Sequence, residues 1–268
     1  MENYLLAALL GVIEGLTEFL PVSSTGHLIL FVDLLGFKAP PGRTFEVMIQ
    51  LGAILALVVL YFRKLWATLT GLPTDPAARR FAAVIVAAFI PAMILGAAFH
   101  SQIKAVLFSP TVVATALIIG GFVILAVERL QKRVLYPTVD DVPVRTGFLI
   151  GLAQAMALVP GVSRSGATII GGLLLGLDRR AAAEFSFFLS IPTMAAAFAY
   201  DAFKNRDALS FDDAGVIAVG FVCAFFAALV VVKPFLAIVS RVGFAPFAYY
   251  RIALGALVLW LVHAHGGL

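Results

Sequence analysis

The chain has 268 residues, of which 62% are hydrophobic and only 13% are charged. Its mean hydropathy is +1.05, whereas an ordinary soluble domain is about half apolar and about a quarter charged. This composition excludes a water-soluble fold, a disordered chain, a collagen and a coiled coil, and it predicts one all-α membrane domain, 1–268. The net charge of +4 does not indicate a nucleic-acid partner, because most basic residues lie between apolar segments, where they usually set orientation.

Six apolar stretches are long enough to cross a bilayer as helices. They cover residues 44–62, 82–99, 111–128, 184–201, 214–232 and 247–265. Two further apolar segments, 3–32 and 147–176, are interrupted by proline, glycine and serine at 21–26 and 160–166. Such clusters end helices, and irregular backbone survives at membrane depth only where it faces protein or a water-filled cavity. We therefore expect both segments to be re-entrant helix–loop–helix hairpins.

The two interrupted segments resemble each other. Residues 11–29 align with residues 151–169, and the identical pairs are Gly11/Gly151, Val22/Val162, Ser23/Ser163, Gly26/Gly166 and Ile29/Ile169. Each half of the chain, about 1–135 and about 140–268, then contains one hairpin followed by three spans. Because three is odd, the two halves should have opposite orientations. This predicts an inverted repeat, an architecture common in transporters, whose broken helices meet near the bilayer midplane.

Basic residues give the expected orientation. If each hairpin returns to the side it entered, twelve of the 19 lysines and arginines lie on one side, in loops 63–81, 129–146, 177–183 and 233–246. The opposite side holds five, which are Lys38, Arg43, Lys104, Lys204 and Arg206. The richer side should be cytoplasmic. Both termini and the first hairpin then face outward, and the second hairpin enters from the cytoplasm.

Several ionisable residues lie inside or at the ends of the apolar segments. They are Glu14, Glu18, His27, Glu46, Arg164, Glu184 and Arg251. A charge at the centre of a span costs about 2.5–3.5 kcal/mol, so these groups must face one another, water or a ligand. Structural ion pairing is the simplest alternative, and it is as strong as a functional role for Glu46, Glu184 and Arg251.

The first hairpin carries two carboxylates and a cluster of hydroxyls. Glu14 and Glu18 are four residues apart and share a helix face, which favours a bound cation between them or one protonated carboxyl serving as acid or base. Ser23, Ser24 and Thr25 precede a helix whose free N–H groups suit an anion. His27 could form a base–nucleophile pair with Ser24, attack phosphorus itself, or serve only as a packing donor.

The second hairpin supplies the cation. Arg164 is a permanently charged fork suited to phosphate oxygens, and Ser163, Ser165 and Thr168 place hydroxyls beside it. If the two loops meet, the combined residues suit a phosphate or diphosphate with a divalent ion held by the carboxylates. A site of this kind inside a membrane implies a substrate with a lipid tail.

At these motifs the chain resembles the bacterial undecaprenyl-diphosphate phosphatase family, also known as the bacitracin-resistance family. The resemblance rests on segments 14–27, 45–52, 160–168 and 184–187. It implies hydrolysis of undecaprenyl diphosphate to undecaprenyl phosphate and inorganic phosphate, which recycles the lipid carrier for peptidoglycan synthesis and confers bacitracin resistance. It also implies a multi-pass protein of the bacterial cytoplasmic membrane, in contact with membrane lipids, whose active site faces the periplasm. A homodimer is one alternative for its assembly.

The resemblance also assigns residues. The implied catalytic residues are Glu14, Glu18, Ser24, His27 and Arg164. The implied substrate-binding residues are Ser23, Thr25, Ser163, Ser165 and Thr168. The family is associated with a divalent metal, usually Mg²⁺ or Ca²⁺, which Glu14 and Glu18 would bind. The nucleophile stays open between Ser24, His27 and a metal-activated water, and the inverted repeat leaves a transporter or flippase of a lipid phosphate as the alternative function.

Overall fold

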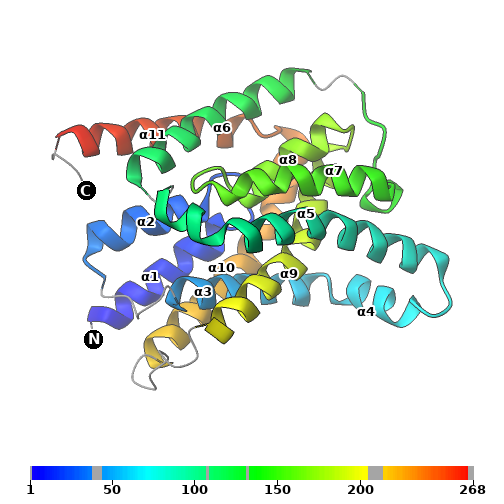
Figure 1. Ribbon diagram of the computed structural model, residues 1–268, viewed down its shortest axis with the longest axis horizontal. Helices are drawn as coiled ribbons and strands as arrows, with labels where there is room; N and C mark the ends of the chain where they lie inside the picture. Colours follow the sequence, from blue (N-terminus) through cyan, green and yellow to red (C-terminus); the bar gives the residue numbers. More distant parts are fainter. Residues whose placement is uncertain (1, 38–43, 107–108, 131–132, 205–213, 265–268) are drawn as a thin grey trace.

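A computed structural model describes residues 2–37, 44–106, 109–130, 133–204 and 214–264, and within these ranges the chain forms helices and no strand. Several long helices, among them α5 (Pro76–Val106), α6 (Pro110–Leu130) and α11 (Ala245–Ala264), follow the long axis of the molecule (Figure 1). This arrangement confirms the predicted all-α fold.

The two interrupted segments are helix–loop–helix hairpins, as expected. The first consists of α1 (Glu2–Thr17) and α2 (Ser24–Leu35). The second consists of α7 (Val144–Ala155), the short 3-10 helix η3 (Met156–Leu158) and α8 (Arg164–Leu174). The residue before the second helix of each hairpin, Ser23 or Ser163, has a positive φ, 68° or 77°. A non-glycine residue in this region is strained by about 1–2 kcal/mol, so both loops are held in place by their surroundings.

The six predicted spans are helices as well. Besides α5, α6 and α11 they are α3 (Thr44–Leu60), α9 (Arg179–Lys204) and α10 (Ala214–Arg241), and the last residue expected in the final span, 265, lies outside the described residues. Five of the described helices are long and apolar enough to cross a membrane alone. The sixth candidate is α3 together with α4 (Phe62–Gly71), which is bent from it by 75°. The chain is therefore a multi-pass membrane protein.

Two expectations about the loops are wrong. The segment 63–81 holds most of α4 and the beginning of α5, and the segment 233–246 holds the end of α10 and the beginning of α11. Hydropathy detects only the apolar part of a helix, and polar residues extend these helices beyond it. Of the basic residues expected on the less basic side, Lys38, Arg43 and Arg206 lie outside the described residues, as do the side chains of Lys104 and Lys204. The orientation in the membrane stays a prediction.

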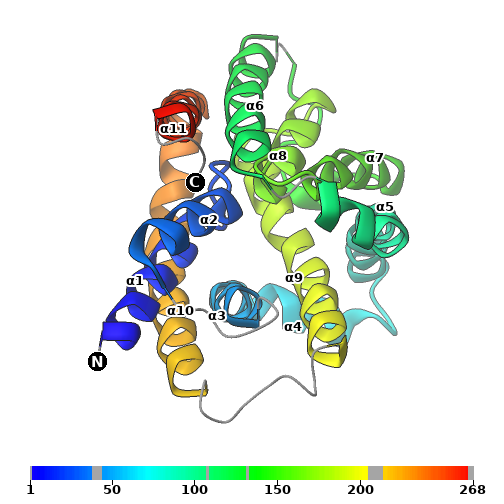
Figure 2. The ribbon, with the colours of Figure 1, turned by 60° about the vertical axis from the view of Figure 1, so that its left-hand side comes forward.

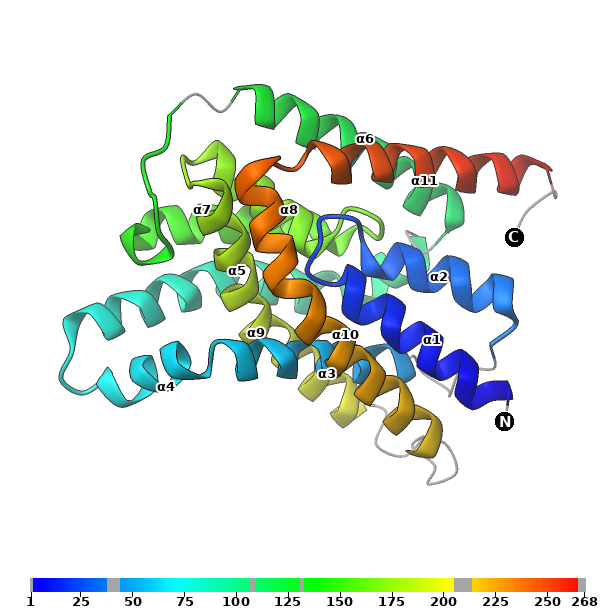
Figure 3. The same ribbon diagram turned by 180° about the vertical axis from the view of Figure 1, so that it is seen from behind.

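The packing of the helices repeats between the two halves. Helix α1 lies along α10 (Figure 3), and its counterpart α7 lies along α5. Both contacts depend on glycine: a Cβ on Gly11 would lie 2.2 Å from the carbonyl oxygen of Gly220, and one on Gly151 would lie 2.1 Å from that of Ala88. Small residues allow helices to approach closely in membranes. Helices α6 and α11 pack side by side (Figure 2). The opposite orientation of the halves stays a prediction.

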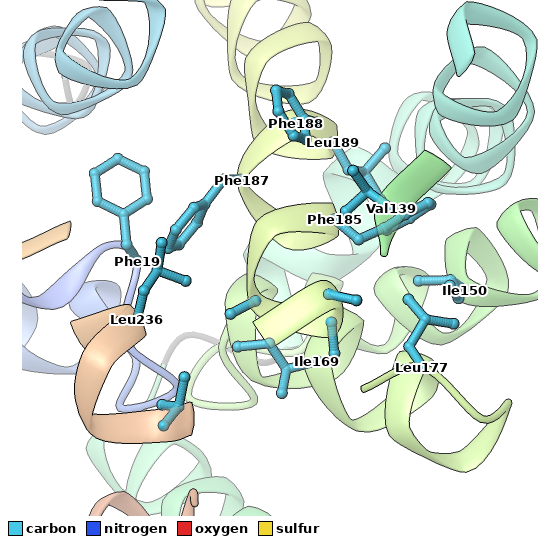
Figure 4. Packing of buried hydrophobic residues seen from close by; sticks show 14 of the residues in the cluster. Phe19, Val139, Ile150, Ile169, Leu177, Phe185, Phe187, Phe188, Leu189 and Leu236 are labelled. Carbon is cyan, nitrogen blue, oxygen red and sulfur yellow. The ribbon is translucent and has the colours of Figure 1, made fainter. Parts of the chain in front are cut away.

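A buried aromatic cluster fixes the first loop against α9. The Phe19 ring lies 5.6 Å from the Phe187 ring in an edge-on arrangement (Figure 4). The centre of the Phe187 ring lies 6.0 Å from that of Phe235 on α10. All three side chains are at most 1% exposed. Because Phe19 follows Glu18 and Phe187 follows Ser186, this packing positions two residues that both accept hydrogen bonds from Arg164.

Candidate active site

The loops of the two hairpins touch each other. The hydroxyl of Ser165, at the start of α8, donates a hydrogen bond of 2.7 Å to the carbonyl of Leu20 in the first loop. Ser163 Oγ lies 3.0 Å from Ser165 Oγ and accepts a hydrogen bond from the Gly166 N–H, so it also caps α8. In the first hairpin the Ser23 hydroxyl caps α2 in the same way, 3.3 Å from the Gly26 nitrogen. The two loops therefore form one structure, with both helix N-termini beside it.

Arg251 of α11 holds these loops together. Its side chain is fully buried, and its guanidinium group donates to five backbone carbonyls. The acceptors are Pro21 in the first loop, Gly161 and Val162 in the second, and Ala116 and Leu117 of α6. From the sequence, Arg251 is open between ion pairing and a functional role. Among the described residues its hydrogen bonds go to carbonyls and not to a carboxylate.

Glu18 and Arg164 form a buried ion pair across the two hairpins. Glu18 Oε1 lies 2.9 Å from an Arg164 terminal nitrogen, and the exposed fractions of the two side chains are 5% and 12%. The other terminal nitrogen of Arg164 donates to the Ser186 carbonyl at 2.8 Å, so the guanidinium is held from two sides. Glu18 Oε2 accepts a short hydrogen bond from the hydroxyl of Ser24. One carboxylate thus contacts both an arginine and a serine hydroxyl.

Glu14 lies one turn before Glu18 and is fully buried. Neither of its carboxylate oxygens has a hydrogen-bond partner among the described residues. A buried, unpaired carboxylate is costly and requires a proton or a cation nearby. The described part of the chain contains no cluster of three or more histidine, cysteine or acidic side chains suited to a metal. Two carboxylates still fit Mg²⁺, which is often bound by one or two carboxylates together with water and substrate phosphates.

His27 faces α11. Its Nδ1 lies 2.7 Å from the carbonyl oxygen of Ser23, so this nitrogen carries the proton. Its Nε2 lies 2.6 Å from the hydroxyl of Tyr250, which is then the donor. The side chain is 2% exposed, and the rings of His27 and Tyr250 stack with 5.6 Å between their centres. Both ring nitrogens are therefore occupied by groups other than Ser24, and the serine hydroxyl bonds to Glu18 instead.

The other predicted residues occupy two different places. Thr25 and Ser163 line the same cavity as Glu18, Ser24 and Arg164. The hydroxyl of Thr168 lies 2.7 Å from that of Ser186 and 2.9 Å from the carbonyl of Arg164, so it supports the loop. Ser165 is likewise used in the contact between loops. Glu184 forms an ion pair with Arg180 at 3.2 Å, so for this residue the structure shows the ion pairing that was the alternative to a functional role.

The cavity has a volume of about 790 Å³. Its polar wall comes from both hairpin loops, and its apolar walls come mainly from α2, α5 and α9, with side chains such as Leu28, Phe89, Met93, Ala97, Met194 and Ala197. Sequence analysis did not select Gln50 or Gln154, which also line it. Gln154 aligns with Glu14 in the repeat, and its Oε1 is buried without a partner among the described residues. Ser186 and Tyr250 were also missed: Ser186 lies in the motif 184–187 but was not selected as a site residue, and no motif marks Tyr250.

This arrangement suits an anion attached to an apolar group. An arginine and two helix N-termini attract phosphate, a serine hydroxyl lies against a carboxylate, and the remaining walls are hydrocarbon. Together with the helical fold, it defines a multi-pass membrane protein with an internal cavity that is polar at one wall and apolar at the others. The chain belongs to the family described as "Bacitracin resistance protein BacA", whose pattern matches residues 7–257.

Curated relatives match over almost the whole chain. A protein of Phenylobacterium zucineum named "Undecaprenyl-diphosphatase" is 57% identical over 260 residues, which is 97% of each chain. A protein of the same name from Caulobacter vibrioides is 56% identical and covers 98% of this chain and 99% of its own. "Undecaprenyl-diphosphatase 1" of Agrobacterium fabrum is 55% identical and covers 96% of each chain. The resemblance drawn from the motifs is thereby confirmed.

Proposed function

We propose that the chain hydrolyses undecaprenyl diphosphate to undecaprenyl phosphate and inorganic phosphate, the activity in the names of its relatives. The reaction regenerates a lipid carrier for peptidoglycan synthesis, and an excess of the enzyme would confer bacitracin resistance. The observation that carries the proposal is the hydrogen-bonded set of Ser24, Glu18 and Arg164 at the wall of a largely apolar cavity.

Binding of the diphosphate follows from charge. Arg164 offers a planar fork for two phosphate oxygens, and the N-termini of α2 and α8 add free N–H groups and the positive ends of two helix dipoles. Thr25 and Ser163 line the same wall and can donate hydroxyl hydrogen bonds. The apolar walls take the first prenyl units, and the rest of the chain stays in lipid.

The geometry favours Ser24 as the nucleophile and Glu18 as its base. Glu18 accepts the Ser24 proton while Ser24 Oγ forms a bond to the terminal phosphorus and the bond from that phosphorus to the bridging oxygen breaks. Undecaprenyl phosphate leaves, and Arg164 balances the charge on the transferred group. Water then attacks the phosphoserine, which releases inorganic phosphate and returns the proton to Ser24. His27, with both nitrogens bonded elsewhere, fixes the Ser23 carbonyl and hence the loop.

Glu14 and Glu18 would hold the divalent ion, Mg²⁺ or Ca²⁺; the Glu14 carboxylate oxygens have no hydrogen-bond partner among the described residues. When bound, the ion neutralises charge on the diphosphate. The protein would lie in the bacterial inner membrane, with the site open to the periplasm. The excess of basic residues between the apolar segments that are predicted to end on the other side of the membrane supports this orientation.

The decisive test is phosphate release by the purified protein from undecaprenyl diphosphate. Ser24→Ala and Glu18→Gln should each reduce turnover by at least about 100-fold, the range for loss of a positioned base or nucleophile. Thr115→Val, which removes an exposed hydroxyl bonded within α6, is the matched control and should retain activity. Normal turnover by Ser24→Ala would refute the assignment of the nucleophile.

The repeated halves favour transport of a lipid phosphate as the second candidate function. In liposomes, a transporter would move undecaprenyl phosphate between leaflets and release no phosphate from the diphosphate. That result would replace the proposed hydrolysis.

A further inference from the structure

Helix α4 is attached to the rest of the protein by one of its faces. Lys64 Nζ lies 2.6 Å from Asp140 Oδ2 and 4.6 Å from the centre of the Phe81 ring. Leu65, the next residue, packs against the main hydrophobic core. These contacts fix the position of a helix that has no fully buried residue.

A second face of α4 is apolar and points away from the protein. Phe62, Trp66 and Leu69 are spaced four and three residues apart, so they share one face. Their exposed fractions are 55%, 55% and 60%, and the rings of Phe62 and Trp66 stack with 5.9 Å between their centres. Three large apolar side chains are thus held on the surface without a cover from the described residues.

Basic residues accompany this face. The segment 62–80 has four basic residues and one acidic residue. Arg63 on α4 and Arg79 at the start of α5 are exposed. An arginine at the depth of the hydrocarbon core is costly, whereas one near an anionic headgroup is stabilised. The charges therefore favour the headgroup level over the bilayer interior.

The bend of 75° between α3 and α4 agrees with this placement. If α3 crosses the bilayer, a helix bent this far from it runs close to the membrane plane. We propose that α4 is an interfacial helix, whose Phe62, Trp66 and Leu69 face is embedded at the headgroup level of a leaflet rich in anionic lipid. An exposed Phe, Trp and Leu face with exposed arginines beside it is typical of helices that lie in the interface. This inference does not depend on the proposed catalytic activity.

Tryptophan fluorescence can test the depth directly, because the chain has two tryptophans. A Trp260→Phe protein keeps Trp66 as the only reporter. It is reconstituted into phosphatidylcholine–phosphatidylglycerol vesicles with bromines near the headgroup, midway along the acyl chain or near its end. We expect the strongest quenching, at least about twofold over the deepest label, from bromines near the headgroup. Strongest quenching near the chain end would mean that α4 belongs to a bent span, and would overturn the proposal.

Two controls complete the experiment. The Trp66→Phe protein reports Trp260, which is 63% exposed on the spanning helix α11, and provides a reference. Protection of Trp66 from every bromolipid, at high but not at low protein density, would show that a second copy covers the face and would overturn the proposal. When both arginines are present in the Trp260→Phe protein, replacing phosphatidylglycerol by phosphatidylcholine should move Trp66 to a shallower depth. If the same lipid change moves Trp66 equally far in the Arg63→Gln/Arg79→Gln variant of this protein, the contact with anionic lipid is overturned.

Discussion

Replacement of Arg164 by lysine tests the contact between the two hairpins. Arg164 donates to Glu18 at 2.9 Å with one terminal nitrogen and to the Ser186 carbonyl at 2.8 Å with the other. A lysine ammonium cannot span both acceptors, so one charged hydrogen bond is lost, which is worth about 1.5–3 kcal/mol. If this loss falls on the transition state, kcat/KM drops by about 10- to 150-fold.

The assay is phosphate release from undecaprenyl diphosphate in detergent, with the amount of folded protein checked by size-exclusion chromatography. Arg180→Lys is the matched control, because Arg180 makes an exposed pair with Glu184 within one helix and should stay within about twofold of wild type. A Glu18→Gln/Arg164→Lys protein should lose less than the product of the two single effects, since both residues belong to one pair. Unchanged kcat/KM in Arg164→Lys would refute the proposed role of this pair.

Three further changes probe the structure around the site. Arg251→Met removes the donor for five carbonyls and should destabilise the protein by about 3–5 kcal/mol. A thermal unfolding assay would record this loss as a fall in Tm of roughly 6–20 °C. An unchanged Tm would contradict the role of Arg251 in joining the loops. Gly151→Val places carbon atoms against the Ala88 carbonyl and should lower the yield of folded protein. The control Gly36→Ala has open space around it and should be the milder change, although Gly36 has a positive φ. Equal yields of the two variants would contradict the close packing of α5 and α7. A chelator should reduce the activity of the wild-type protein at least about tenfold, and added Mg²⁺ or Ca²⁺ should restore it. The metal should not restore the activity of Glu14→Gln, which lacks one of the two carboxylates proposed to bind it. Full activity in the chelator would refute the proposed metal.

The sequence was sufficient to predict the spans and the hairpin loops, for local physical reasons. Twenty-residue apolar stretches and clusters of proline and glycine determine where helices cross and break, whatever their neighbours are. Glu18, Ser24 and Arg164 were predictable because charged and hydroxyl groups in an apolar segment need partners. Helix α4 was missed because Arg63, Lys64 and two threonines interrupt its apolar residues and its ten residues are too short for a span.

Other features depend on contacts between distant residues. The five carbonyls around Arg251 belong to three separate parts of the chain, and every residue has a carbonyl, so no pattern marks them. The orientation of His27 depends on Tyr250, which lies 223 residues away. A histidine beside serine hydroxyls in sequence suggested a base for Ser24, but the helix turns the ring toward α11. Tertiary packing, and not the motif, decides this geometry.

The most direct measurement follows the terminal phosphate during one turnover. Undecaprenyl diphosphate labelled at its terminal phosphorus is mixed with excess enzyme, quenched in milliseconds to seconds, and the protein is digested and mapped. We expect a transient label on Ser24, which is absent from the Ser24→Ala protein and accumulates when hydrolysis of the phosphoserine is slowed. A label on His27, or rapid release by Ser24→Ala without any labelled protein, would contradict Ser24 as the nucleophile.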